Sequence, residues 1–208
     1  MRVRRLGIER AVEFAPDVFT DHRGTSVQAL RAGTFAEATG HDFFAVRQTL
    51  FSTSRRGVVR GIHFTATPPG SRKYVYCARG ASLDILVDIR TGSPTFGRWE
   101  AVRLDARERR AVYFPPGVGH AFAILEEDTV MAYLLSNDYV PELELAVSPL
   151  DPELGLPIPD DITPILSERD REAPALAEAL AAGILPDYAA CLALDAPDAA
   201  FPVAETRP

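Results

Sequence analysis

The feature that most constrains the fold is a series of short apolar runs, separated by turn residues, between residues 43 and 148. Turn signals such as Pro68-Pro69-Gly70 and Pro115-Pro116-Gly117 recur between the runs. Short runs at roughly 8–12-residue spacing are typical of an antiparallel sandwich or barrel, and none of them shows a helical stripe. We therefore predict an all-β fold with strands at Phe43–Phe51, Val58–Phe64, Lys73–Ala78, Ser82–Ile89, Arg98–Leu104, Ala111–Phe114, His120–Leu125 and Thr129–Leu135.

The rest of the chain completes one domain, as expected for 208 residues. In Ser82–Ile89, alternation puts one set of residues on one face (Leu83, Ile85, Val87 and Ile89) and another on the opposite face (Asp84, Leu86 and Asp88). The two carboxylates are either solvated or line a polar cavity. We predict one helix, Asp170–Ala182, within a domain that spans residues 1–188. The Ala/Pro/Asp-rich stretch 189–208 is predicted to be a loosely ordered tail.

Composition excludes several classes of protein. A hydrophobic share of 47% excludes wholesale disorder, and a net charge of −7 argues against a sequence-independent nucleic-acid binder. No apolar run approaches the roughly 20 residues needed to cross a membrane, and Met1 to Pro16 lacks the apolar core of a secretion signal. Cys77 and Cys191 are not in a Cys-x-x-Cys pair, so we expect unpaired thiols and a cytoplasmic protein.

One basic residue stands out. Of the 22 basic residues, 21 are arginine, and Lys73 is the single lysine. The bias looks like coding in a GC-rich genome, under which surface cations drift to arginine. A surviving lysine indicates a place where a compact ammonium is required, although chance alone can also leave one.

Two of the four histidines lie in predicted strands. His22 and His41 are in loops and are expected at the surface, whereas His63 lies inside an apolar strand three residues after Arg60. A buried strand rarely carries both an imidazole and a cation unless it faces a polar cavity, but a hydrogen-bonded core histidine also fits the pattern. Strict alternation separates the two side chains, so we infer that Gly61 forms a bulge that turns both toward one cavity.

A metal site is not expected. His63 is followed by no second histidine or carboxylate at ligand spacing, and His120, at the start of its strand, supplies no third ligand. Tyr133 lies in the middle of a strand and Tyr139 in the loop after it. On composition alone, we expect each tyrosine to have a half-buried ring and a hydroxyl group that is exposed to water.

Several motifs together resemble one known family. They are Arg60-Gly61-Ile62-His63-Phe64, then Pro68-Pro69 and Lys73, then Asp84 to Trp99, then Pro116-Gly117-x-Gly119-His120-Ala121-Phe122. In this order and spacing they resemble the dTDP-4-dehydrorhamnose 3,5-epimerase family, and the chain is similar above all to members of antibiotic deoxysugar pathways such as 5-epimerases. The resemblance covers residues 1 to about 188. It implies a metal-free, cupin-type double-sheet jelly roll with no cofactor, which usually forms a homodimer by strand exchange.

The resemblance also implies a reaction and the residues that carry it. An epimerase of a dTDP-4-keto-6-deoxyhexose, acting at C5, C3 or both, needs a base on one face of the sugar and an acid on the other. His63 matches the base, Asp170 the group that holds its ring, and Tyr133 the acid. Lys73 matches the cation beside the 4-keto oxygen.

Further positions match the family's substrate-binding residues. Arg23 and Arg60 match the diphosphate contacts, and His120, Tyr139 and Gln48 match other substrate-binding positions. Two departures alter the expected pocket. Residues 25–28, Thr-Ser-Val-Gln, lack the aromatic ring and the carboxylate that grip thymidine, and Leu50 stands where the family often has asparagine. We therefore expect a substrate already modified at C2 or C3.

Other functions remain open at this level. The main alternatives are a metal-dependent cupin enzyme such as a dioxygenase, and a non-catalytic sugar-nucleotide binding protein. A sugar 3,4-ketoisomerase, which is a related cupin enzyme, is a further alternative. In each case we expect a small-molecule ligand, with no nucleic acid and no membrane as partner.

Overall fold

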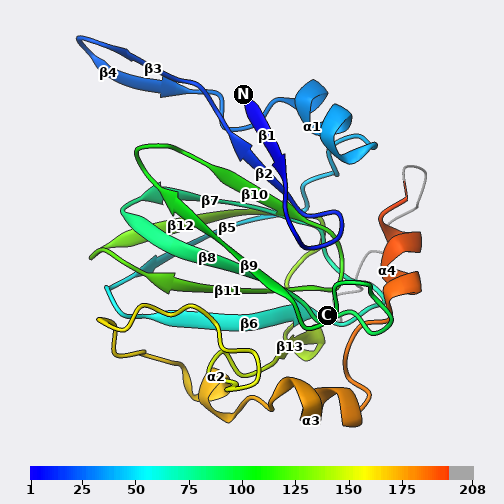
Figure 1. The fold of residues 1–208 in the computed structure, drawn as a ribbon. Coiled ribbons are helices and arrows are strands. Elements are labelled where there is room, and N and C mark those ends of the chain that lie inside the picture. The colour runs from blue at the N-terminus through cyan, green and yellow to red at the C-terminus, as the bar shows by residue number, and fades with distance from the viewer. Residues whose placement is uncertain (197–208) are drawn as a thin grey trace.

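The computed structural model describes residues 1–196 and confirms the all-β jelly roll (Figure 1). Six strands form one sheet in the order β1-β2-β10-β7-β12-β5, and five form the other in the order β13-β6-β11-β8-β9. A separate hairpin, β3-β4, projects from the body beside β1 and β2. The strands are β1 (Arg2–Arg5), β2 (Val12–Ala15), β3 (Val18–Asp21), β4 (Gly24–Val27), β5 (Gln48–Ser54), β6 (Val59–Thr65), β7 (Lys73–Arg79), β8 (Ala81–Asp88), β9 (Trp99–Asp105), β10 (Ala111–Phe114), β11 (Val118–Ile124), β12 (Thr129–Leu135) and β13 (Glu144–Ala146).

Three apolar clusters hold these layers together. The cluster between the two sheets includes Val75, Leu86 and Phe122. A second cluster packs the outer face of the five-stranded sheet against the segment that carries helices α2 (Glu168–Glu172) and α3 (Leu176–Ala181). The third packs α1 (Ala32–Thr39) on the outer face of the six-stranded sheet. Alternation in β8 follows the prediction, because Ile85 and Val87 belong to the second cluster and Leu86 to the first.

The predicted strands after residue 58 lie within two residues of the observed ones, but the N-terminal part differs. Strands β1–β4 and α1 were not predicted from the sequence. The run Phe43–Phe51 is strand only from Gln48 onward, since Phe43 and Phe44 pack in the cluster beneath α1. Strands β1–β4 have four residues each, as β10 does, but none of them is an unbroken apolar run like that of β10, so pattern alone does not distinguish them from a loop.

The predicted helix Asp170–Ala182 is two short helices. They are separated at Ala173-Pro174-Ala175, where Ala173 is extended with φ −61° and ψ 139°. Proline supplies no backbone N–H and disfavours helical geometry in the residue before it, so the helix ends there. The helical periodicity of the sequence continues across this break and concealed it.

Part of the predicted loose tail is ordered. Helix α4 (Tyr188–Leu194) buries Cys191, and Asp195, which follows it, is 2% exposed. The Asp195 carboxylate accepts hydrogen bonds from Tyr113 Oη at 2.8 Å and Arg72 Nε at 3.2 Å. A buried carboxylate with these donors holds the end of the helix against the barrel. The remainder of the predicted tail, residues 197–208, lies outside the described residues.

His41 also belongs to this cluster, contrary to the predicted surface position. Its side chain is buried, and its Nε2 atom lies 3.6 Å from Asp195 Oδ1. The loop position in the sequence gave no sign of this, because the partner is 154 residues away along the chain. His22 is exposed, as predicted.

We expect Asp195→Asn to lower the free energy of unfolding by about 3 kcal/mol or more, because it removes one partner of a buried charged cluster. Urea denaturation followed by circular dichroism measures this change. Asp160→Asn is the matched control, since Asp160 is exposed and its substitution is expected to leave the midpoint unchanged. Equal midpoints for the two variants would show that the end of α4 contributes nothing to stability.

Candidate functional site

A cavity of about 260 Å³ lies between the two sheets. Its walls come from β5, β7 and β12 of the six-stranded sheet, from β6 and β11 of the five-stranded sheet, and from the loop after β12. Most of the predicted site residues line it, namely Gln48, Arg60, His63, Lys73, His120, Tyr133 and Tyr139. The fold thus brings these predicted site residues, which come from both sheets, to the walls of one cavity.

Gly61 explains how Arg60 and His63 reach the same cavity. The pairing of β6 with β11 joins His63 to His120 and Arg60 to Phe122, so β6 carries one extra residue there. Gly61 has φ +120°, and a Cβ atom on it would lie 2.5 Å from the His120 carbonyl oxygen. Only glycine fits this conformation and this close approach. The bulge predicted at Gly61 is confirmed.

His63 is held by Asp170. Its Nε2 atom lies 2.6 Å from Asp170 Oδ1, and Asp170 is buried in α2, where its backbone N–H donates to Ser167 Oγ. Burial disfavours the charged carboxylate, but the hydrogen bond and charge of His63 outweigh burial and hold the pKa of Asp170 below its usual value. With Nε2–H donating to the carboxylate, a neutral His63 ring carries its lone pair on Nδ1.

A second histidine–aspartate pair lies beside the first. His120 Nε2 is 2.8 Å from Asp84 Oδ2, and both side chains are buried. Of the two alternatives for Asp84, a solvated position or a polar interior, the second is therefore correct. Asp88 is buried too, but its carboxylate pairs with Arg90 and does not face the cavity. The sequence signal for Asp84 was its place opposite the apolar face of β8.

Tyr133 projects from β12 in the opposite sheet. Its ring centroid lies 6.1 Å from that of His120 and 6.4 Å from that of Phe122. Burial first, and the nearby charge of Asp84 second, raise the pKa of Tyr133 above its usual value. The phenol is therefore protonated at neutral pH and has a proton to donate. Tyr139, by contrast, is 54% exposed at the cavity rim.

Lys73 begins β7 and lies in the cavity with its side chain 12% exposed. Its Nζ atom is 4.0 Å from Glu144 Oε2, and Glu144 Oε1 accepts a hydrogen bond from Thr65 Oγ1 at 2.6 Å. The carboxylate compensates the ammonium while leaving it room to bind another oxygen. Sequence reasoning missed Glu144, as well as Arg169, which lines the cavity next to Asp170 in the Ser-Glu-Arg-Asp segment.

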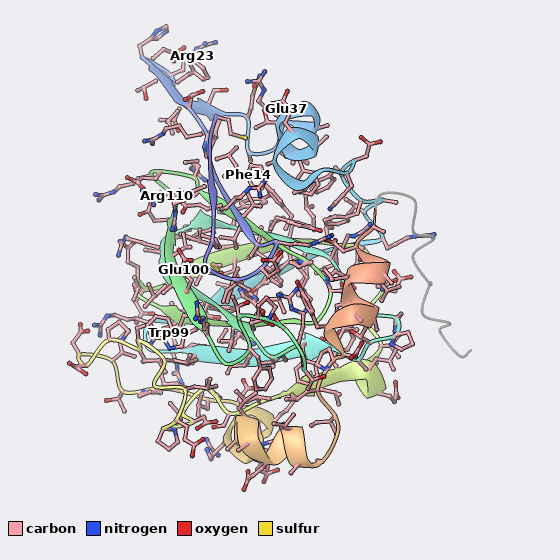
Figure 2. The ribbon with its side chains drawn as sticks, turned by 45° about the vertical axis from the view of Figure 1, so that its right-hand side comes forward. Phe14, Arg23, Glu37, Trp99, Glu100 and Arg110 are labelled. Carbon is pink, nitrogen blue, oxygen red and sulfur yellow. The ribbon has the colours of Figure 1, made fainter. Side chains whose placement is uncertain are left out.

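Arg60 and Arg23 differ in their placement. Arg60 lines the cavity, and its Nη2 atom donates to Ser54 Oγ at 3.2 Å. Arg23 is far from the cavity at the turn of the β3-β4 hairpin, where its side chain is 79% exposed and pairs with Asp21 at 2.6 Å (Figure 2). Within one copy of the chain, Arg23 therefore does not line the cavity.

Two general features of residues 1–196 complete the description of the site. No group of three or more histidine, cysteine, aspartate or glutamate side chains in this range is placed to hold a metal ion. None of the helices in the same range is long and apolar enough to span a membrane.

Comparison with known proteins identifies the fold and the family. A 3-epimerase of dTDP-4-dehydro-6-deoxyglucose from Streptomyces bikiniensis is 51% identical over 185 residues, which cover 89% of this chain and 94% of the relative. NovW, a 4-keto-6-deoxy sugar epimerase from the novobiocin biosynthetic gene cluster of Streptomyces spheroides, has a crystal structure that matches with a TM-score of 0.88 and 49% identity, over 92% of this chain and 95% of that one. ChmJ, a 3'-monoepimerase from Streptomyces bikiniensis in complex with dTDP-quinovose, matches with a TM-score of 0.87 and 49% identity, over 91% and 96% of the two chains. The family model described as dTDP-4-dehydrorhamnose 3,5-epimerase matches residues 5–178, and the chain belongs to this family.

Proposed function

We propose that the protein epimerises a dTDP-4-keto-6-deoxyhexose at C3, C5 or both, in deoxysugar biosynthesis. One observation carries the proposal: a histidine oriented by a buried carboxylate and a protonated phenol line the same cavity from opposite sheets. Inverting a carbon next to a ketone requires removal of a proton on one face and delivery on the other. The arrangement of His63 and Tyr133 supplies both groups.

The reaction proceeds by two proton transfers. His63 takes the proton from the carbon beside the 4-keto group, and the C–H bonding electrons form the enolate. Asp170 stabilises the imidazolium that results. Lys73 stabilises the charge that develops on the keto oxygen, and Tyr133 gives a proton to the opposite face of the same carbon. Each well-placed proton-transfer group contributes roughly 10²–10⁴ in rate.

The substrate class rests on the relatives and on the charge of the cavity. NovW is described as a 4-keto-6-deoxy sugar epimerase, and ChmJ is bound to dTDP-quinovose. The Arg60 guanidinium donates to Ser54 Oγ through Nε and Nη2, which leaves other N–H donors for a diphosphate. The matched Streptomyces bikiniensis relative is named for C3 and the family for C3 and C5, so the proposal includes both carbons.

We further propose a homodimer in which Arg23 of one copy serves the cavity of the other. The β3-β4 hairpin forms its own two-stranded sheet and projects from the body. Phe19 on it is 64% exposed and Val18 is 39% exposed, which is unfavourable for a hairpin that remains in water.

Cys77 and Cys191 are both buried and unpaired, which supports a cytoplasmic location.

His63→Ala is expected to abolish uptake of solvent deuterium at C3 and C5, whereas Tyr133→Phe should retain exchange and lose most net inversion. The base alone suffices to remove and return a proton on one face, but inversion needs the acid. NMR of dTDP-4-keto-6-deoxyglucose incubated in D₂O measures both quantities. Exchange at wild-type rate in His63→Ala would exclude this residue as the base. No exchange by the wild-type protein, either with this sugar or with its 2-deoxy derivative, would favour a silent binding protein.

The pairing of Asp170 predicts how stability depends on pH. Its folded-state pKa lies below the usual value, so it stabilises the fold above about pH 4, and this contribution is lost as the pH falls through the lowered pKa. The difference in unfolding free energy between wild type and Asp170→Asn should therefore shrink as the pH falls from about 5 through the lowered pKa of Asp170. Urea titrations at several pH values measure this difference, and a constant difference would contradict the ionised pair.

A mixing experiment tests the exchange of Arg23. If Arg23 acts in the partner's cavity, a heterodimer of Arg23→Ala and His63→Ala contains one complete site. Refolding equal amounts of the two inactive variants together should then restore about a quarter of wild-type activity, since half of the dimers are mixed and each has one working site. Each variant refolded alone is the control. No recovery in the mixture would assign Arg23 to the cavity of its own chain, and wild-type activity of Arg23→Ala refolded alone would assign it to no site.

A further inference from the structure

The inner face of β5 forms one wall of the cavity. Gln48, Leu50 and Ser52 alternate on this face and all line the cavity. Leu50 is paired directly with Tyr133 on β12, while Gln48 is paired with Leu135 and Ser52 with Met131. Directly paired side chains on one face of a sheet lie within about 5.5 Å at Cβ. Leu50 is therefore the apolar side chain that lies beside the proposed acid on this wall.

The neighbours of Leu50 on this wall are polar. Gln48 Oε1 is buried and has no hydrogen-bond partner among residues 1–196, whereas Ser52 interacts with the Tyr133 phenol. Buried polar atoms without partners are uncommon, and at a cavity wall they indicate a ligand that supplies the missing bonds. A ligand along β5 thus meets polar, apolar and polar side chains in turn, with the apolar one beside Tyr133.

The core does not require Leu50. The other apolar residues of the cavity, Phe122 and Leu135, pack in the cluster between the sheets, whereas Leu50 belongs to none of the three clusters. β5 is an edge strand, and Leu50 is 43% exposed. Its methyl groups are therefore available to a ligand, and changing them leaves the barrel intact.

We propose that Leu50 contacts a deoxygenated carbon of the sugar and selects against an oxygen at that carbon. The inference rests on the proposed epimerase function and specifies its substrate. A hydroxyl pressed against Leu50 loses its bond to water and gains no partner, whereas a methyl or methylene group loses nothing. Gln48, with its unpartnered Oε1 atom, binds a polar group beside that carbon.

Two carbons of the substrate class have this chemistry. One is C6, which is a methyl group in a 6-deoxyhexose and a hydroxymethyl group in a hexose. The other is C2, which is a methylene group in a 2,6-dideoxyhexose; one relative at 42% identity, from Streptomyces antibioticus, is named a probable epimerase of such a sugar, dTDP-4-oxo-2,6-dideoxy-D-glucose. Two pairs of substrates distinguish C6 from C2.

The experiment compares kcat/KM within these pairs by deuterium uptake at C3 or C5. The C6 pair is dTDP-4-keto-6-deoxyglucose and dTDP-4-keto-glucose; the C2 pair is dTDP-4-keto-2,6-dideoxyglucose and dTDP-4-keto-6-deoxyglucose. We expect wild type to prefer the deoxygenated member of one pair by about tenfold or more. Leu50→Asn, which adds a donor and an acceptor, should reduce that preference by about fivefold or more.

Two control variants separate polarity from other effects. Leu50→Met stays apolar with similar volume and should keep the wild-type preference. Thr49→Asn adds the same amide on the exposed outer face of β5, outside the cavity lining, and should also keep it. A wild type without preference in either pair, or a preference that Leu50→Asn changes by less than fivefold, overturns the inference. Absence of deuterium uptake by wild type from all three sugars overturns the epimerase function instead.

Discussion

The site depends on one backbone constraint, the bulge at Gly61. A regular strand would place Arg60 and His63 on opposite faces of the sheet. The extra residue in β6 turns both into the space between the sheets, and the approach to the His120 carbonyl leaves no room for a Cβ atom. Because of this one irregularity, the guanidinium of Arg60 and the imidazole of His63 share one wall of the cavity, and Tyr133 lines it from the other sheet.

The cost of burying charge determines the rest of the site. Each cavity histidine has its own aspartate, Asp170 for His63 and Asp84 for His120, and Lys73 lies near Glu144. Pairing keeps ionised groups stable in a half-dry interior. It also fixes the histidine rings, because each Nε2–H is committed to a carboxylate. The same pairs that stabilise buried charge therefore determine which atoms of the histidine rings remain available to a substrate.

The sequence predicted the central strands and most of the cavity, and its failures have physical causes. Short apolar runs between strong turns identify strands locally, and motif order was sufficient to group His63, Lys73, His120 and Tyr133. The division of the predicted helix at Pro174, the burial of His41 and the order of α4 depend on distant partners. Such contacts leave no periodic signal in the chain, and the isolated position of Arg23 becomes apparent only when the hairpin is seen to leave the body (Figure 1).

The anchoring of Asp195 has a consequence for biosynthesis. Its carboxylate binds Arg72, the residue immediately before the cavity lysine, and Tyr113 on the strand next to β7. A chain still emerging from the ribosome contains every strand of the barrel before this carboxylate has left the exit tunnel. A barrel that forms on the ribosome therefore does so without the bond that secures the beginning of β7, and the cavity reaches its final geometry only once Asp195 has left the tunnel.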